Sequence, residues 1–271
     1  LILKGNYGVN AKIQKQNTFF PVIKDQPFPR AEAELRKSYE DEYQLVAETF
    51  LTYYKTFADI HTVNVSAGFS TEKYKGDGFG AERRVFSDES EDQQYLNNGQ
   101  RVQNAEGIAK DESALASYFA RAFYSYMDKY LLTLTFRADG SSKFAKGNRW
   151  GQFPAFSLGW RLSEEEFMKN VDFISNLKLT GGWGSLGNQK IKDFQYLSTI
   201  EKGGGSWNTY NFGGHYSYGS TILQLGNPNI TWEKTYMTNL ALEAGFLNNR
   251  LNPAITYFNK NTKDILLSTV E

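Results

Sequence analysis

The stretch Tyr118 to Arg137, YFARAFYSYMDKYLLTLTFR, alternates apolar and polar side chains on both sides of a short polar turn. Even-numbered positions carry aromatic, leucine or alanine side chains, and Arg121 and Thr133 are among the polar residues between them. A period of two is that of an extended strand, since a helix brings every third or fourth residue to one face. The stretch therefore predicts two antiparallel strands joined by a tight turn at Asp128 and Lys129.

The same alternation returns in other parts of the chain, in segments of strand length. These segments lie near residues 1–12, 43–53, 63–70, 156–162, 177–183, 240–246 and 251–257. The last two are joined through Asn248 and Asn249, residue types that suit the positive φ angles of a type I′ hairpin. Together with the first pair, they predict an all-β chain of nine strands.

The connections between these strands alternate in length. Those near Asp59, Asp128 and Asn248 are a few residues long, whereas those around 16–42, 75–113, 139–151 and 187–232 are long and polar. A medium link, Ser163 to Ser175, has the Ser163/Glu166 spacing of a capping box and predicts one helical turn. Short turns on one side and long loops on the other are typical of an antiparallel barrel that crosses a membrane.

Composition excludes several classes of protein. Lys plus Arg and Asp plus Glu are both 30, so no net charge would recruit nucleic acid. The absence of cysteine excludes disulfide scaffolds and thiolate metal sites. No run of about 18 apolar residues could form a transmembrane helix, and residues 1–8 do not resemble a signal peptide.

In lipid, strands must close into a cylinder because every backbone polar group needs an internal partner. The alternation then predicts that the apolar set faces outer-membrane lipid while its polar neighbours line the interior. The charged residues expected to face the lumen are Arg121, Arg137, Arg161, Lys178 and Glu243. Trp160 and Trp183 are expected on the lipid side or in an aromatic girdle.

The stretch Asp128 to Gly159, DKYLLTLTFRADGSSKFAKGNRWGQFPAFSLG, resembles a signature of the SusC/RagA family of TonB-dependent outer-membrane transporters of Bacteroidota. Further segments agree with that family in the same order. They are SYFARAFYSY (117–126), WRLSEEEFM (160–168), ISNLKLTGGWGSLGNQ (174–189), GNPNITWEK (226–234) and FLNNRLNPAITYFNKNTKD (246–264). Residues before 117 are compatible with the family but less distinctive.

The resemblance implies part of a 22-strand transmembrane barrel. It also implies import of oligosaccharides or peptides with a SusD-like surface lipoprotein and energy from TonB. No plug, TonB box or N-terminal extension domain is recognised, so residues 1–271 are expected to be a portion of the barrel with its long extracellular loops. Nine strands cannot complete such a barrel, and an open sheet in lipid would be unstable without the remainder.

Catalysis, metals and cofactors have little support in the sequence. Only His61 and His215 are present, and His61 is expected to be a plain polar residue beside a turn. The acidic run 88–92 lacks the ligand spacing of an EF-hand and predicts a solvated loop. Glycines 76, 78 and 80 are not followed by a helix pattern and predict loop flexibility in place of a phosphate site.

The longest loop carries one cluster that could bind a ligand, because exposed rings stack on sugars or hold peptide side chains. It consists of Trp207, Tyr210, Phe212, His215, Tyr216 and Tyr218. The alternative is that these aromatics pack the loop on itself or against the lipoprotein.

Two other classes of protein remain open on the residues alone. A soluble extracellular β-domain could bind glycans through the same loop aromatics. A secreted glycosidase would need two carboxyl groups roughly 5 to 10 Å apart, a proximity that sequence does not reveal.

Overall fold

A computed structural model describes residues 1–25, 27–107, 112–202 and 209–267. The chain divides into two compact units. Unit 1 comprises residues 1–6, 47–71 and 114–271, and unit 2 comprises residues 7–46 and 72–113. In the described ranges, no helix is long and apolar enough to cross a membrane.

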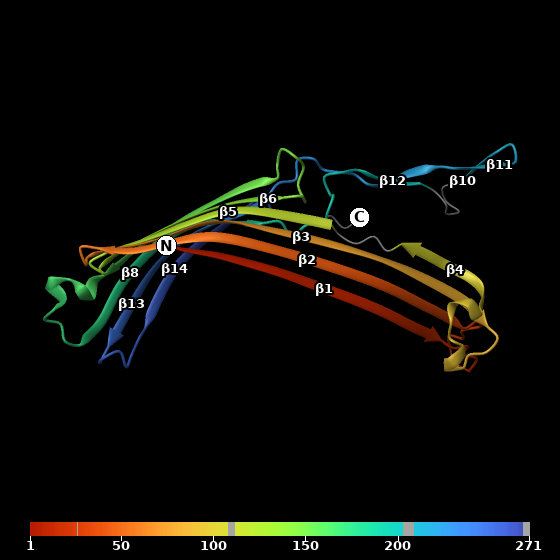
Figure 1. Ribbon diagram of the computed structural model, residues 1–271, viewed down its shortest axis with the longest axis horizontal. Coiled ribbons are helices and arrows are strands. Elements are labelled where there is room, and N and C mark those ends of the chain that lie inside the picture. Colours follow the sequence, from red (N-terminus) through yellow and green to blue (C-terminus); the bar gives the residue numbers. More distant parts are fainter. Residues whose placement is uncertain (26, 108–111, 203–208, 268–271) are drawn as a thin grey trace. The chain divides into compact units, whose positions relative to one another are not determined.

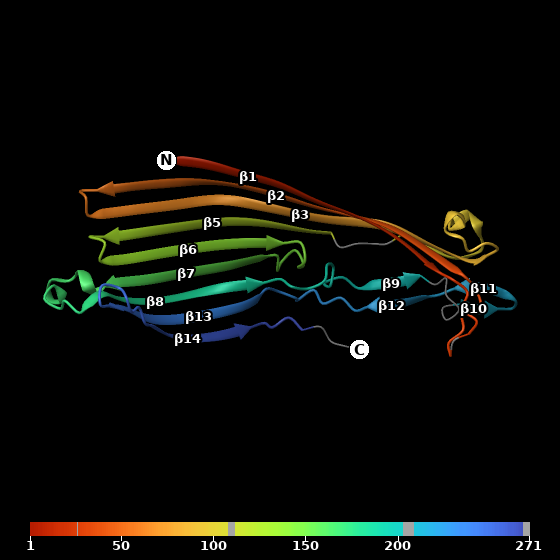
Figure 2. The ribbon, with the colours of Figure 1, turned by 90° about the horizontal axis from the view of Figure 1, so that it is seen from below.

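One sheet contains ten strands, nine of which form a continuous path in the order β1-β2-β3-β5-β6-β7-β8-β13-β14, with β4 paired to β3. Their bounds are β1 Ile2–Phe20, β2 Glu34–Phe57, β3 His61–Phe86, β4 Gly99–Gly107, β5 Glu112–Tyr126, β6 Tyr130–Ser141, β7 Trp150–Arg161, β8 Ile174–Asn188, β13 Glu233–Phe246 and β14 Ala254–Lys263. In unit 1 the strands from β5 to β14 of this path lie side by side, as Figure 2 shows.

The nine strands of the path are the nine that the alternation predicts. Their antiparallel register brings the apolar sets opposite one another: Leu134 pairs with Ala122 on β5 and with Phe156 on β7. Further along the sheet, Gly181 of β8 pairs with Leu158 and Leu240. A one-residue slip would move every apolar side chain to the other face, so this register preserves the amphipathic sheet.

The strands extend further than predicted, and β4 was missed. β1 reaches Phe20, β2 begins at Glu34 and β3 continues to Phe86, so much of the expected loop sequence is paired backbone. Glycines 76, 78 and 80 lie inside β3, not in a loop. The prediction relied on one apolar face, and that signal disappears where both faces of a strand are polar although the backbone ladder continues.

The described part of the long connection between β8 and β13 contains four short strands, of which Figure 1 labels β10, β11 and β12 and Figure 2 also labels β9. β9 (Thr199–Lys202) pairs with β12 (Ser220–Gln224), and β10 (Thr209–Phe212) pairs with β11 (His215–Tyr218). The β10–β11 turn is formed by Gly213 and Gly214, both at positive φ, as a two-residue type I′ turn requires.

The short connections also use left-handed backbone. Met127 and Asp128 have φ of 52° and 56°, so the tight turn begins at Met127, one residue before the predicted Asp128–Lys129 pair, and includes both of those residues. Asn248 and Asn249 have φ of 57° and 61°, as predicted, and Leu247 shares this conformation. These values agree with the twist that a hairpin turn needs.

The link between β7 and β8 contains two 3-10 turns, η3 (Leu162–Glu164) and η4 (Glu166–Met168). The predicted helical turn is therefore present, but the predicted capping box is wrong. The residues preceding the two turns are Arg161 and Glu165, and neither makes a side-chain cap hydrogen bond. Glu166 bonds Lys169 instead.

The apolar set forms one face of the sheet, which we call the apolar face, and it stays open. Leu134, Leu158 and Leu240 are each between 48% and 55% exposed. The other sheets in the described part of the chain are the two short hairpin ladders of the β8–β13 connection. A soluble sandwich would bury these side chains against a second sheet, so the fold agrees with a lipid-facing surface.

Candidate functional site: the polar face and a polar pocket

The opposite side of the unit 1 sheet, which we call the polar face, carries the charged residues singled out in the sequence. Cross-strand pairing aligns Arg161, Lys178 and Glu243 in one row. The Nζ atom of Lys178 lies 3.6 Å from a carboxylate oxygen of Glu243. Arg121 pairs across the sheet with Thr135. A face that carries this many charges suits a wall in contact with water.

Arg137 is the most firmly held of these residues. Its Nε donates to both carboxylate oxygens of Asp139, at 2.8 and 2.9 Å, and its Nη2 donates to Oγ of Ser117 at 2.9 Å. Ser117 and Asp139 are themselves buried. Charge-assisted hydrogen bonds of this kind fix a guanidinium in one orientation, which makes Arg137 a structural anchor of the wall.

An aromatic cluster on the polar side escaped the sequence reasoning. Phe153 lies opposite Arg137, and its ring packs 5.4 Å from Trp232, which in turn lies 5.2 Å from Phe144. All three rings are buried, and the indole nitrogen of Trp232 donates to the carbonyl of Arg149 at 2.8 Å. The cluster fastens the β6–β7 link and the segment before β13 to the wall. The sequence offered one signal for this cluster, namely large aromatic rings at positions where the alternation calls for polar side chains.

Of the predicted ligand cluster of the long loop, the structure describes the side chains of Tyr210, Phe212 and His215. Tyr210 and Phe212 lie on one face of the β10–β11 hairpin, with ring centroids 6.4 Å apart, and are 60% and 67% exposed. His215 pairs opposite Phe212. Tyr216 and Tyr218 pair with Asn211 and Thr209 in the backbone register, and Trp207 lies outside the described residues.

Two rows of rings cross the apolar face of unit 1. Tyr126, Tyr130 and Trp160 stack in succession beside the short turns, with centroids 6.2 and 6.4 Å apart. Towards the long loops, Tyr118 lies 5.1 Å from Phe69 and 5.9 Å from Trp150. Trp183 belongs to the same face, beside Phe156 and Tyr236. Aromatic rows near both ends of the strands are typical of the two interfaces of a membrane.

Glu165 secures the first of these rows from the β7–β8 link. Its carboxylate accepts hydrogen bonds from the Tyr130 hydroxyl at 2.7 Å and the Trp160 indole nitrogen at 3.0 Å, and Lys129 Nζ lies at 3.5 Å. The bonds from Tyr130 and Trp160, with a smaller contribution from Lys129, lower the pKa of Glu165 below its usual value. His61 joins the same row, since its ring lies 5.0 Å from that of Tyr126, and its Nδ1 lies 2.8 Å from the Tyr124 hydroxyl.

The acidic run at 88–92 is tied into its own loop. Asp88 accepts hydrogen bonds from the Ser90 hydroxyl at 2.7 Å and backbone amide at 2.9 Å, and both bonds lower the pKa of Asp88. Glu89 accepts the Val22 amide at 3.2 Å. Within the described ranges, no group of three or more His, Asp or Glu residues is arranged to hold a metal ion.

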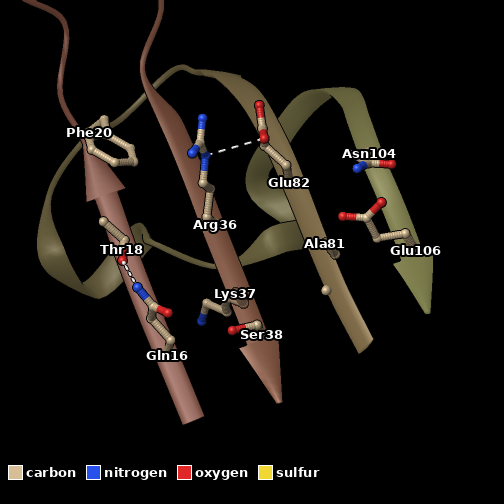
Figure 3. Close-up of a pocket in the computed structure, with 11 residues that line it drawn as sticks. Gln16, Thr18, Phe20, Arg36, Lys37, Ser38, Ala81, Glu82, Asn104 and Glu106 are labelled. Atoms are coloured by element: carbon tan, nitrogen blue, oxygen red, sulfur yellow. Dashed lines mark hydrogen bonds and ion pairs between the residues drawn. The ribbon is translucent and has the colours of Figure 1, made fainter. Parts of the chain in front are cut away.

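Unit 2 contains a further site that the sequence did not suggest. We call it the polar pocket, and Figure 3 shows the side chains that β1 to β4 contribute to it. Its lining includes Gln16, Thr18, Phe20, Arg36, Lys37, Ser38, Glu82, Asn104 and Glu106. Hydroxyl, amide, carboxylate and guanidinium groups, with one aromatic ring, can hydrogen-bond a polar ligand such as a sugar or a peptide backbone.

An ion-pair network holds the floor of the polar pocket. Arg36 pairs with Glu34 and, at 3.3 Å, with Glu82 (Figure 3), while Arg84 contacts the same two carboxylates at 2.9 Å each. The guanidinium of Arg36 also lies 5.3 Å from the ring centre of Phe20. Each charge of this network has a partner, and Lys37 and Glu106 add one charge of each sign to the lining. The pocket is therefore close to neutral, which suits an uncharged or zwitterionic ligand better than an ion.

Comparison with known proteins agrees with this architecture. A family model described as "TonB dependent receptor-like, beta-barrel" matches residues 4–271. The TonB-dependent receptor P39 of Formosa agariphila is 34% identical over 98% of this chain and 25% of its own length. The TonB-dependent receptor SusC of Bacteroides thetaiotaomicron is 44% identical over 58% of this chain and 16% of its own.

Solved structures show the same fold. The RagAB peptide transporter superposes with a TM-score of 0.86 at 24% identity, over 98% of this chain and 29% of the matched chain. The chain thus spans a quarter or less of the two curated relatives named above. The chain belongs to the TonB-dependent receptor-like β-barrel family, and its sheet is part of the wall of a transmembrane barrel in the bacterial outer membrane.

Proposed function

We propose that the protein to which this chain belongs imports oligosaccharides or peptides across the outer membrane, driven by TonB. The observation that carries the proposal is an antiparallel sheet with one open apolar face and one charged face, in a chain of this family. Such a sheet can separate lipid from a polar passage, which is the task of a transporter wall.

In this proposal, residues 1–271 supply barrel wall and extracellular loops, while the plug and the segment that contacts TonB belong to other parts of the longer protein. A SusD-like surface lipoprotein is the expected partner on the long-loop side, as the similarity to SusC suggests. Arg121, Arg137, Arg161, Lys178 and Glu243 would line the passage. The soluble glycan-binding domain is less favoured, because it gives no role to the open apolar face.

The chain is also proposed to catalyse no reaction. Among the described residues, His61 is engaged with the Tyr124 hydroxyl and His215 stands opposite Phe212 on the loop hairpin, and neither arrangement resembles a histidine that activates a nucleophile. In this proposal, the barrel contributes a path and binding surfaces for the transported substrate.

The decisive experiment deletes the full-length gene and, in a separate strain, the energising TonB. Both strains are then grown on single oligosaccharides or peptides as the limiting nutrient. Loss of growth on the same nutrient in both strains, restored by the full-length gene, supports import. Normal growth on every nutrient tested in the deletion strain, or release of the native protein from membranes by salt alone, contradicts it.

The substrate role of the loop hairpin is tested separately with Tyr210→Ala/Phe212→Ala in the full-length protein. If these rings contact substrate, the concentration for half-maximal uptake rises while the lipoprotein still co-purifies. If they contact the lipoprotein, co-purification falls first. No change in either measurement would remove the hairpin from the binding surface.

A further inference from the structure

Unit 2 has a second pocket, which shares Gln16, Lys37, Ser38 and Ala81 with the polar pocket. We call it the lysine pocket. It is lined by Lys15, Gln16, Asn17, Lys37, Ser38, Tyr39, Phe79, Ala81 and Leu96. Two ammonium groups, a hydroxyl and two amides therefore stand beside aromatic and aliphatic side chains, and none of the lining residues is acidic.

An aromatic ring lies beside each lysine of the lysine pocket without neutralising it, and the ring beside Lys37, that of Tyr95, is outside the lining. Tyr39 and Phe79 stack with centroids 5.6 Å apart. Lys15 Nζ lies 6.0 Å from the ring centre of Tyr39, and Lys37 Nζ lies 5.4 Å from that of Tyr95. An aromatic face attracts an ammonium group but accepts few of its hydrogen bonds, so the donors stay free for another ligand.

Both lysines lack a carboxylate partner within the described part of the chain. Two other lysines of unit 2 are paired, Lys12 with Glu42 at 3.8 Å and Lys73 with Glu112 at 3.9 Å. Two neighbouring unpaired cations repel each other unless an anion lies between them. This pocket therefore has the charge to receive an anionic group.

The position of the lysine pocket along the strands indicates where that anion comes from. On β1, Lys15 shares the side-chain parity of Tyr7, Val9 and Ile13, which are between 58% and 78% exposed. On β2, Lys37 and Tyr39 share the parity of Tyr43 and Leu45. The apolar residues belong to the set expected to meet lipid, and the two lysines follow them towards the long loops.

We propose that the lysine pocket binds the phosphate group of an anionic membrane lipid in the leaflet on the long-loop side. The ammonium groups of Lys15 and Lys37 contact the phosphate, and Tyr39, Phe79 and Leu96 pack against the adjoining part of the lipid. A lipid is favoured over a soluble phosphate because the pocket opens on the side that carries the apolar residues.

The test uses the full-length protein, purified in a zwitterionic detergent, and titrates it with phosphatidic acid or with phosphatidylcholine of the same chains. Native mass spectrometry counts bound lipid. The Lys15→Gln/Lys37→Gln variant should bind phosphatidic acid about thirtyfold more weakly, because each basic group near a membrane surface contributes roughly fivefold. Lys12→Gln is the matched control, since it removes a paired lysine from the same strand and should leave binding unchanged.

Two further measurements test whether charge is sufficient for binding and whether the ligand is a lipid. Lys15→Arg/Lys37→Arg retains both charges and should bind phosphatidic acid within about twofold of the natural protein. Inorganic phosphate added at equal concentration should not displace the lipid. Equal binding of both lipids, equal binding by the glutamine variant, or displacement by inorganic phosphate would overturn the assignment to a lipid.

Discussion

Phe153 stands on the face of β7 that the alternation assigns to polar side chains, and it is 5% exposed. It is accommodated because glycines lie beneath its ring. A Cβ atom built on Gly187 of β8 would overlap the ring, and one on Gly151 would meet both Phe153 and Trp232. At Gly187 and Gly151, the absence of a side chain leaves room for an aromatic ring. Composition alone does not reveal this role of glycine.

Replacing Gly187 by alanine should therefore destabilise the barrel. The added methyl must displace Phe153 from the buried cluster, and overpacking of this kind costs about 1 to 3 kcal/mol. Thermal unfolding of the full-length protein in detergent measures the effect. Gly8→Ala, where the built Cβ meets nothing within 4 Å, is the control and should change stability by less than about 0.5 kcal/mol.

Glu165 links a titratable group to the row of rings at the short turns. Because its pKa is lowered in the folded protein, its ionised form favours folding at pH values above its unfolded pKa. That contribution decreases as the pH falls through the folded pKa, where the carboxylate becomes protonated. Stability should thus depend on pH in the acidic range through this residue.

The Glu165→Gln variant should lower the melting temperature at neutral pH and lose less stability than the natural protein as the medium is acidified. The amide cannot supply the charge-assisted bonds that Tyr130 and Trp160 now make. Glu164→Gln, an exposed neighbour in the same link, is the matched control. Parallel melting curves for Glu165→Gln and natural protein across pH would show that the hydrogen-bonded carboxylate has no energetic role.

At the scale of the elements, one hairpin turn requires backbone at positive φ but carries a residue type that disfavours it. Ala58 and Asp59 have φ of 49° and 56°, and the Ile60 amide donates to the Phe57 carbonyl at 3.2 Å. This is a type I′ turn, which usually carries asparagine, aspartate or glycine at its two central positions. Alanine occupies the first of them at a cost, because its Cβ disfavours left-handed backbone.

Ala58→Asn should accordingly stabilise the protein by about 0.5 to 1 kcal/mol, since asparagine tolerates positive φ. Ala58→Val should destabilise it, because a β-branched side chain tolerates that conformation least. The two variants are compared by thermal unfolding in detergent. Equal melting temperatures for Asn and Val would show that this turn does not limit stability.

At the scale of the whole molecule, the sheet order ends at β1 on one side and at β14 on the other. Free strand edges in hydrocarbon leave amide and carbonyl groups without partners, which is strongly unfavourable. The chain covers 25% of its Formosa agariphila relative and 29% of the matched RagAB chain. We therefore expect the partner strands in a longer protein of which this sheet forms part.

Residues 1–271 expressed alone should therefore fail to form a stable membrane barrel. Reconstitution in lipid vesicles, followed by electrophoresis with and without heating, should show no heat-dependent shift, whereas the full-length protein should show one. A compact, protease-resistant form of residues 1–271 in vesicles would contradict this prediction and would require closure of the sheet by self-association.

The period of two in the sequence determined the nine strands of the main path and their apolar face, because burial in lipid requires a strict alternation of side chains. The family was recognised from the ordered motifs between residues 117 and 264. It did not determine β4, the extent of β1 to β3 or the two loop hairpins, since those ladders are held by backbone hydrogen bonds that leave no apolar pattern.

Only the tertiary structure decided which side chains meet. The polar pocket joins residues from β1 to β4, and the Phe144–Phe153–Trp232 cluster joins three segments of the chain. Such contacts depend on cross-strand register and close approach over glycine, which are set by the pairing of distant strands. For this protein the sequence specified a wall, and the folded sheet placed the groups that can bind ligands on its two faces.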